Sequence, residues 1–233
     1  MEFNFDISPI RMENMTRQSR KIYCAGPLFN PMERKEMADI AMNLQSGGYG
    51  VFLPQQDGLE FAKLYPVLIQ QGLSSENARR ILNSAIFALD VYEITHCDGL
   101  LLNMNGRVPD EGAMVEAGIA WSYDKIMVIF KTDDRSLVEG VCNPLVMGLT
   151  DFEFVSKYTD IAGKFDHLFD ALDQKQKDSI SVSEQIKTKG ETISQYLSGR
   201  KSPIEIAELL VDLFGRSSCP NTSEKIRTYT LIP

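Results

Sequence analysis

The stretch GLLLNMNGRVPDEGAMVEAGIAWSYDKIMVIF, residues 99–130, decides the fold of this chain. It begins with Gly99-Leu-Leu-Leu-Asn103, a continuous apolar run that is typical of a strand covered on both faces. A helix of small and apolar residues follows, and Lys125-Ile-Met-Val-Ile-Phe130 is a second strand of the same kind. Because parallel strands need a long crossover between them, this order predicts a parallel strand–helix–strand unit.

The same alternation continues on both sides of this unit. Short apolar runs predict three more strands, at residues 21–25, 50–54 and 152–155. Helical patterns predict further helices at residues 32–44, 75–95 and 159–172, and a loop with a helical piece over the sheet at residues 59–75. The predicted fold is therefore α/β, with a doubly wound five-stranded parallel sheet of the Rossmann- or flavodoxin-like kind.

A ligand site is expected at one edge of this sheet, because ligands of open α/β sheets bind outside the carboxyl ends of the strands. Three loops follow strands at that edge: Gly26-Pro27, the polar loop at residues 55–58, and residues 103–112. The sequence thus predicts that these loops border a single crevice.

The domain organisation follows from a change of composition near residue 173. Residues 20–172 form the predicted α/β domain, and residues 1–19 are an irregular extension. Residues 174–202 are rich in Lys, Gln, Ser and Thr, and then Ser202-Pro203 opens an amphipathic helix that ends at Gly215. Residues 173–233 are therefore expected to be a polar segment with a helical appendage that packs on the core or on a partner subunit.

Composition excludes several classes of function. The 233 residues carry a net charge of −8 and a pI near 4.9, which argues against a nucleic-acid polymer or an anionic membrane as partner. Four dispersed cysteines and two histidines predict no zinc site, and no cofactor is expected. There is no apolar run of membrane-spanning length and no secretory signal, so a cytoplasmic, reduced protein is the expectation.

Glu116 is the most informative candidate residue. It is the only charge in Gly112-Ala-Met-Val-Glu-Ala-Gly-Ile-Ala-Trp-Ser122, a helix that is expected to be buried on every side. A lone carboxylate there loses hydration and has no lysine or arginine within helical reach, which favours a nucleophile or base. The alternative is that Glu116 points to one wet edge of the helix. Asp110 stands just upstream, where it is the expected helix cap.

Further polar residues fit a site around Glu116. Asp90 interrupts the apolar row of Ile86 and Ile94, so it lies either in the site or at a wet helix edge. Tyr23 ends the first strand with a hydroxyl that could hold a carboxylate, although it could equally be a core residue. Asp98 is expected to stabilise the turn from helix to strand.

Two glycines, Gly26 and Gly112, suggest a backbone that approaches a ligand closely. Neither stands in a G-x-G-x-x-G or G-x-x-x-x-G-K-[ST] pattern, so a dinucleotide or P-loop site is not supported. Gln55 and Gln56 could read the edge of a nucleobase, since an amide both donates and accepts hydrogen bonds.

Taken together, these residues resemble the nucleoside 2-deoxyribosyltransferase family over about residues 20–172. The stretches that carry the resemblance are Lys21-Ile-Tyr-Cys-Ala-Gly-Pro-Leu-Phe-Asn30, Phe52-Leu-Pro-Gln-Gln56, Cys97-Asp-Gly99 and Asp110-Glu-Gly-Ala-Met-Val-Glu-Ala-Gly-Ile-Ala120.

The resemblance implies a role for each matching residue. Glu116 matches the family's nucleophile, and Tyr23 matches the tyrosine that orients it. Asp90 and Asp110 match aspartates that face the nucleobase, and Asp110 is the better match to the proton donor. Asn143, in Cys142-Asn-Pro-Leu-Val-Met147, matches an asparagine that a neighbouring subunit contributes to the sugar 5′-hydroxyl. A homo-oligomer, dimer or larger, is therefore expected.

The function that these features predict is transfer of a 2-deoxyribosyl group between nucleobases, with retention, through an ester on Glu116. The substrates are purine and pyrimidine deoxynucleosides and free nucleobases, as in nucleotide salvage. Two alternatives stay open: a nucleoside or nucleotide N-glycosidase that uses water as acceptor, and a non-catalytic nucleotide-sensing module.

Overall fold

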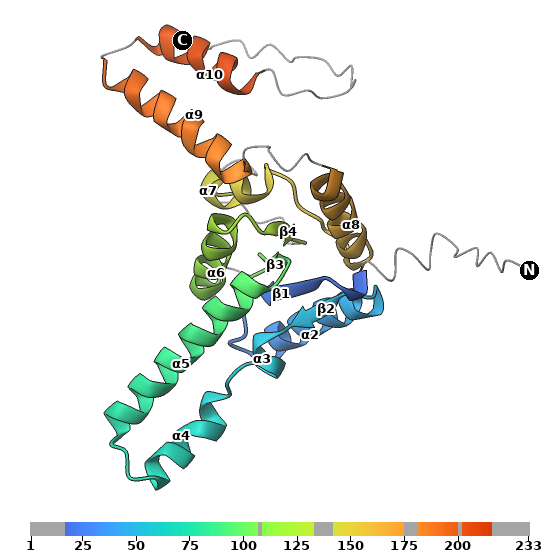
Figure 1. The fold of residues 1–233 in the computed structure, drawn as a ribbon, viewed down its shortest axis with the longest axis vertical. Coiled ribbons are helices and arrows are strands. Elements are labelled where there is room, and N and C mark those ends of the chain that lie inside the picture. The colour runs from blue at the N-terminus through green and yellow to red at the C-terminus, as the bar shows by residue number, and fades with distance from the viewer. Residues whose placement is uncertain (1–16, 107–108, 133–141, 175–180, 200–201, 216–233) are drawn as a thin grey trace, which may run out of the picture. The chain divides into compact units, whose positions relative to one another are not determined.

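A parallel sheet forms the centre of the computed structural model, which describes residues 17–106, 109–132, 142–174, 181–199 and 202–215. Its four strands are β1 (Lys21–Ala25), β2 (Gly50–Phe52), β3 (Gly99–Asn103) and β4 (Ile126–Phe130). Their order is β2-β1-β3-β4 (Figure 1). The direction of winding reverses between β1 and β3, so the carboxyl ends of these two strands flank the expected crevice.

The predicted fifth strand at residues 152–155 is wrong as a strand. Only Val155 pairs, through a single parallel bridge to Phe130. Asp151 and Phe152 have φ angles of 52° and 65°, and this left-handed backbone interrupts the extended conformation before pairing begins.

The chain divides into two compact units, Met1–Ser179 and Ile180–Pro233. Helices of the first unit are α2 (Pro31–Ser46), α3 (Pro54–Asp57), α4 (Phe61–Gln70), α5 (Ser75–His96), α6 (Glu111–Ser122), α7 (Pro144–Met147) and α8 (Tyr158–Gln174), with a 3₁₀ turn, η1 (Gly148–Thr150). Those described in the second unit are α9 (Val182–Leu197) and α10 (Pro203–Phe214).

Helices cover both faces of the sheet, as predicted for a doubly wound fold. Helices α2 and α8 lie on one side of the strands, and α5 and α6 lie on the other (Figure 1). Residues of β1 alternate between the two layers: Ile22 and Cys24 pack in the α2/α8 layer, whereas Tyr23 and Ala25 pack in the α5/α6 layer. This alternation directs Tyr23 toward α5 and α6.

Local sequence explains where the helices begin. Asn30 caps α2 and Glu33 completes a capping box, with Pro31 in the first turn as the sequence predicts. Ser74 caps α5, and Asp110 caps α6 through its side chain. The expectation that Asp110 is a helix cap is confirmed.

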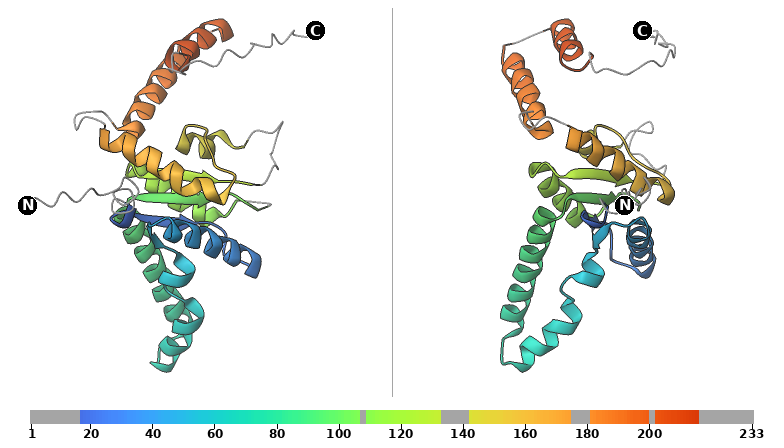
Figure 2. Two further views of the ribbon diagram at one scale, coloured as in Figure 1. Left: turned by 90° about the vertical axis from the view of Figure 1, so that its right-hand side faces the viewer. Right: turned by 45° about the vertical axis from the view of Figure 1, so that its right-hand side comes forward.

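Three sequence predictions about helices need correction. The polar loop expected at residues 55–58 contains the short helix α3. Helix α4 packs against α5 and buries none of its residues, and the two extend away from the sheet as a hairpin instead of lying over it (Figure 2). Helix α6 is not buried on every side, because Val115 is 58% exposed while Ala113, Ala117 and Ala120 are buried.

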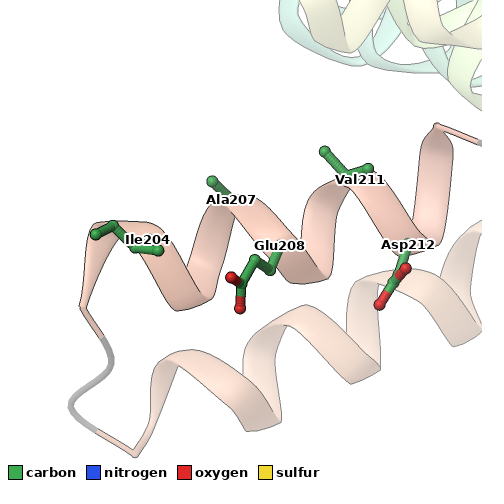
Figure 3. A pocket seen from close by; sticks show the side chains of 5 residues that line it. All are labelled: Ile204, Ala207, Glu208, Val211 and Asp212. Carbon is green, nitrogen blue, oxygen red and sulfur yellow. The ribbon is translucent and has the colours of Figure 1, made fainter.

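The second unit is a pair of helices with no large apolar residue buried among its described positions. Helix α9 replaces much of the polar segment that the sequence predicts at residues 174–202. Ile204, Ala207 and Val211 lie along one side of α10 and line an open hollow (Figure 3). Within the described ranges, no helix of either unit has both the length and the apolar character needed to cross a bilayer.

Candidate active site

Tyr23 and Glu116 form the central contact of the site. The Tyr23 side chain is fully buried and stacks on Phe52 with ring centroids 5.4 Å apart. Its hydroxyl donates a hydrogen bond to Glu116 Oε1 at 2.7 Å. Because β1 lies inside the sheet and α6 packs across it, the phenol reaches the carboxylate from a rigid support.

The environment of Glu116 favours its neutral form. Loss of hydration is the main cause that raises the pKa of this carboxyl group to about 7, and the charges of Asp90 and Asp110 add to it. The hydrogen bond from Tyr23 acts in the opposite direction, since it stabilises the carboxylate. Glu116 is therefore poised to change charge near neutral pH.

Asp90 faces the same point from α5. Burial raises the pKa of its carboxyl group, and the nearby Tyr23 hydroxyl lowers it by a smaller amount. The pKa of Tyr23 is in turn raised by burial and by the charges of Glu116 and Asp90. Asp90 is partly buried, so it combines a position beside Tyr23 with some exposure to solvent, and its role toward a substrate stays a prediction.

Asp110 lies at the start of the helix that carries Glu116. Its Oδ1 accepts from the backbone N–H of Ala113 at 2.6 Å, so one oxygen serves as the cap. A Cβ added to Gly112 would lie 3.1 Å from Asp110 Oδ1, which is the one described atom within 4 Å of it. Gly112 therefore leaves room for the Asp110 carboxyl group.

Two further predicted positions have structural contacts. Gly26 lies where β1 approaches α2 and β3 closely: an added Cβ would be 2.5 Å from Met37 Sδ and 2.9 Å from Asn103 Cβ. Asp98 Oδ2 accepts from the backbone N–H of Lys21 at 2.7 Å, so it stabilises the start of β1, in keeping with its expected structural role.

Three predicted substrate-binding residues do not contact the carboxyl cluster. Gln55 Nε2 donates to the backbone oxygen of Arg34 at 2.8 Å, and its buried Oε1 has no hydrogen-bond partner. Gln56 is exposed. Asn143 caps α7, where its Oδ1 accepts from the backbone N–H of Leu145 at 2.9 Å. Their roles toward a substrate stay predictions.

Phe52 is a site residue that the sequence analysis does not single out. Its ring supports the Tyr23 phenol in a stacked arrangement, with an interplanar angle of 19°. The sequence does offer an indication of this role: Phe52 is an aromatic residue near the end of the predicted strand at residues 50–54, and that end borders the predicted crevice.

The arrangement combines one phenol donor with three carboxyl groups from two helices. A carboxylate held by a phenol can attack an electrophilic carbon, and a second carboxyl group can supply a proton to a leaving group. The site therefore has the components of a retaining glycosyl transfer.

Comparison with known proteins identifies a family. The family model described as nucleoside 2-deoxyribosyltransferase matches residues 22–189. Comparison with curated protein sequences gives no match.

Several solved structures are similar to this chain. A conserved protein from Enterococcus faecalis V583 is 19% identical with a TM-score of 0.49, over 64% of this chain and 98% of that chain. A 2-deoxyribosyltransferase from Bacillus psychrosaccharolyticus is 20% identical with a TM-score of 0.44, over 61% and 90%. The CMP N-glycosidase BcmB from Clostridium botulinum is 17% identical with a TM-score of 0.36, over 64% and 99%. At these identities and TM-scores none of them carries an argument about this chain.

The raised pKa of Glu116 predicts a pH-dependent gain of stability in the variant Glu116→Gln. Between the ordinary value of 4.5 and the folded value of about 7, the unfolded chain releases the proton while the folded chain keeps it. Stability of the wild type therefore falls as pH rises through this window, by about 3 kcal/mol in all. We expect the variant to be more stable by up to that amount at pH 8 and nearly unchanged at pH 4.5, measured by urea denaturation.

The matched control is Glu111→Gln, which removes an exposed carboxylate from the first turn of the same helix. It should not reproduce the gain at pH 8. An equal stability difference for Glu116→Gln at both pH values would show that the Glu116 carboxylate is not destabilised by burial.

Proposed function

The chain belongs to the nucleoside 2-deoxyribosyltransferase family, and we propose that it transfers a 2-deoxyribosyl group from one nucleobase to another. The observation that supports this most strongly is the hydrogen bond from Tyr23 to Glu116. It holds one carboxylate oxygen and leaves the other to attack. The charges of Asp90 and Asp110 both act on Glu116, so either residue is close enough to serve as proton donor when it carries a proton.

In the first step, Glu116 Oε2 forms a bond to C1′ while the bond from C1′ to the base nitrogen breaks through an oxocarbenium-like transition state. The electron pair of that bond leaves with the base, which takes a proton from Asp110. Asp110 can do this while Oδ1 remains the helix cap, since the proton is carried on Oδ2. The product is a glycosyl ester of Glu116.

In the second step, a nitrogen of the acceptor base attacks C1′ and the ester bond breaks. Glu116 leaves as a carboxylate that Tyr23 stabilises again, and Asp110 takes the proton from the incoming base. Two inversions at C1′ give net retention. The absence of a 2′-hydroxyl makes the developing cation easier to form, which suits a deoxyribosyl group.

A nucleoside fits the loop after β1 better than a nucleotide does. A 5′-phosphate needs free backbone N–H groups or an arginine. Here Asn30 accepts from two N–H groups in the first turn of α2, and Glu33 accepts from those of Phe29 and Asn30. Arg34 donates to the backbone oxygen of Leu28 at 2.9 Å. The backbone N–H groups of this turn are thus already occupied within the chain, and one N–H of Arg34 is directed back to it.

The substrate contacts that we propose beyond the carboxyl cluster come from three segments. Gln55 and Gln56 read the edge of the base, and the unpartnered Oε1 of Gln55 supports this role. Asn143 binds the sugar 5′-hydroxyl in the site of a neighbouring subunit. Leu145, two residues beyond Asn143, is 83% exposed, and Val115, beside Glu116, is 58% exposed, which suits a face that a second copy covers.

Incubation of deoxyinosine with free adenine tests the reaction. Transfer predicts deoxyadenosine and hypoxanthine in equal amounts, with little hypoxanthine when adenine is omitted. Hypoxanthine released at the same rate with and without adenine, and without deoxyadenosine, would identify an N-glycosidase instead. Glu116→Gln should lower both rates by several orders of magnitude, because it removes the nucleophile.

Asp110→Asn tests the proton donor. Deoxyadenosine needs protonation of its leaving base, whereas the base of 7-methyl-2′-deoxyguanosine is already cationic in the nucleoside and leaves as a neutral molecule without a proton donor. We expect the variant to lose about 100-fold or more in rate with deoxyadenosine and much less with the methylated substrate. Asp90→Asn is the matched control. Equal losses of Asp110→Asn on both substrates would mean that Asp110 acts only as a helix cap.

Complementation between inactive chains tests the shared site. When Glu116→Ala and Asn143→Ala chains are refolded together, mixed dimers contain one site with both residues intact. Random pairing in dimers then restores about one quarter of wild-type activity. A fully active wild-type monomer at micromolar concentration, established by sedimentation, would contradict the role of Asn143 across subunits.

A further inference from the structure

A buried polar network lies on the face of the sheet opposite to Glu116. It begins at Asn103, the last residue of β3, which is 1% exposed. In the alternation of β3, Asn103 faces the same layer as Leu101, which packs with α2 and α8. An amide in an apolar layer is unfavourable unless its hydrogen-bonding groups are satisfied, so its partners are informative.

Glu36 of α2 binds both amides of this network. Asn103 Nδ2 donates to Glu36 Oε2 at 2.9 Å, and Asn105 Nδ2 donates to Glu36 Oε1 at 2.7 Å. Each carboxylate oxygen accepts from one amide nitrogen. Because an ionised carboxylate can only accept, it determines which way round both asparagine amides lie.

The oxygens of the two amides then bind backbone groups of two loops. Asn103 Oδ1 accepts from the backbone N–H of Asn105 at 3.0 Å, and Asn105 Oδ1 accepts from the backbone N–H of Thr132 at 2.8 Å. Asn105 and Thr132 each stand two residues beyond the end of their strand, β3 and β4 respectively. Glu36 therefore fixes the first turn of both loops.

The loop after β1 meets the network as well. Gly26 lies so close to Asn103 that an added Cβ would be 2.9 Å from Asn103 Cβ. The segments that follow β1, β3 and β4 thus all contact the network of Glu36, Asn103 and Asn105. The loop after β3 leads to Asp110, and the segment after β4 leads to Asn143.

We propose that Glu36 is a positioning residue for the reaction, acting through Asn103 and Asn105 on the start of the loop that leads from β3 to Asp110. Well-packed apolar side chains are often at least as stable as a buried charged network. What the network adds is orientation, because each of its hydrogen bonds specifies one amide direction. The effect on catalysis rests on the function proposed above, whereas the effect on the loops does not.

Glu36→Gln is a sharp test of this role. The two asparagine amides donate to different oxygens of Glu36, and a glutamine replaces one of these oxygens by an NH₂ group, so in this geometry it can accept from only one of them. One asparagine must turn its amide round and lose its bond to a backbone N–H. We expect hydrogen exchange at the amide of Asn105 or Thr132 to accelerate at least tenfold, measured by NMR on the full chain. Glu33→Gln, on the same helix but in its capping box, is the control and should leave both amides unchanged.

The catalytic consequence is measured with deoxyinosine as base release, whichever acceptor is used. We expect kcat to fall about 10- to 100-fold in Glu36→Gln, as for small displacements of reacting groups, with little change in KM. When Glu36→Gln is added to Asp110→Asn, we expect kcat to fall less than about threefold further, since the carboxyl group that Glu36 positions is already absent.

Three results would overturn the proposal. Unchanged exchange at Asn105 and Thr132 would show that Glu36 does not hold the loops. If the losses of kcat in the two single variants multiply fully in the double variant, the network does not position Asp110. The same conclusion would follow from a wild-type rate in Glu36→Gln despite faster exchange. A wild type that releases no base refutes the proposed function instead, and the exchange measurement then decides the role of Glu36 in the loops by itself.

Discussion

The withdrawal of the Glu116 carboxylate from water is the constraint on which the rest of this structure depends. Its charge is destabilised by burial and by two neighbouring carboxyl groups, and among the described residues the Tyr23 hydroxyl opposes these effects. A penalty of about 3 kcal/mol is a large share of the stability of a typical domain. The apolar layers on both faces of the sheet have to offset this penalty. Tyr23 stands on a strand inside the sheet, where packing holds its hydroxyl against Glu116.

The two faces of the sheet have different polar chemistry. On the α5/α6 face, acidic side chains gather around one phenol, Tyr23, whose hydroxyl donates to Glu116. Burial and the neighbouring carboxyl groups raise the pKa of Glu116 there. The α2/α8 face holds Asn103 and Asn105 against Glu36, where each carboxylate oxygen is matched by a donor. An unsatisfied cluster suits a group that must react, and a satisfied one suits groups that must stay in place.

Sequence reasoning predicted the parts of the fold in which neighbouring residues carry the pattern. β3 and β4 are uniformly apolar, and the starts of α2 and α6 have their own caps, so they were recognisable locally. The segment at residues 152–155 also looks like a strand, but the left-handed backbone of Asp151 and Phe152 interrupts its start, and only Val155 pairs. Helix α9 was missed because polar residues dominate its composition, although Val182, Ile186, Ile193 and Leu197 recur at helical spacing. The Glu36 contacts join residues 67 and 69 positions apart, which no local pattern shows.

Asp110 and Glu116 lie at the start and in the middle of one helix, and this has a consequence for how the site assembles. Their mutual placement is a local property of α6 and exists as soon as that helix forms. Tyr23 is 93 positions away from Glu116 and reaches it only when β1 has joined β3 in register. The two carboxyl groups that we propose as acid and nucleophile can therefore be in place in a partly folded chain, whereas the phenol reaches the carboxylate only after β1 and β3 have paired. The proposed activity therefore requires that β1 and β3, the described strands that pair across the largest sequence separation, have joined.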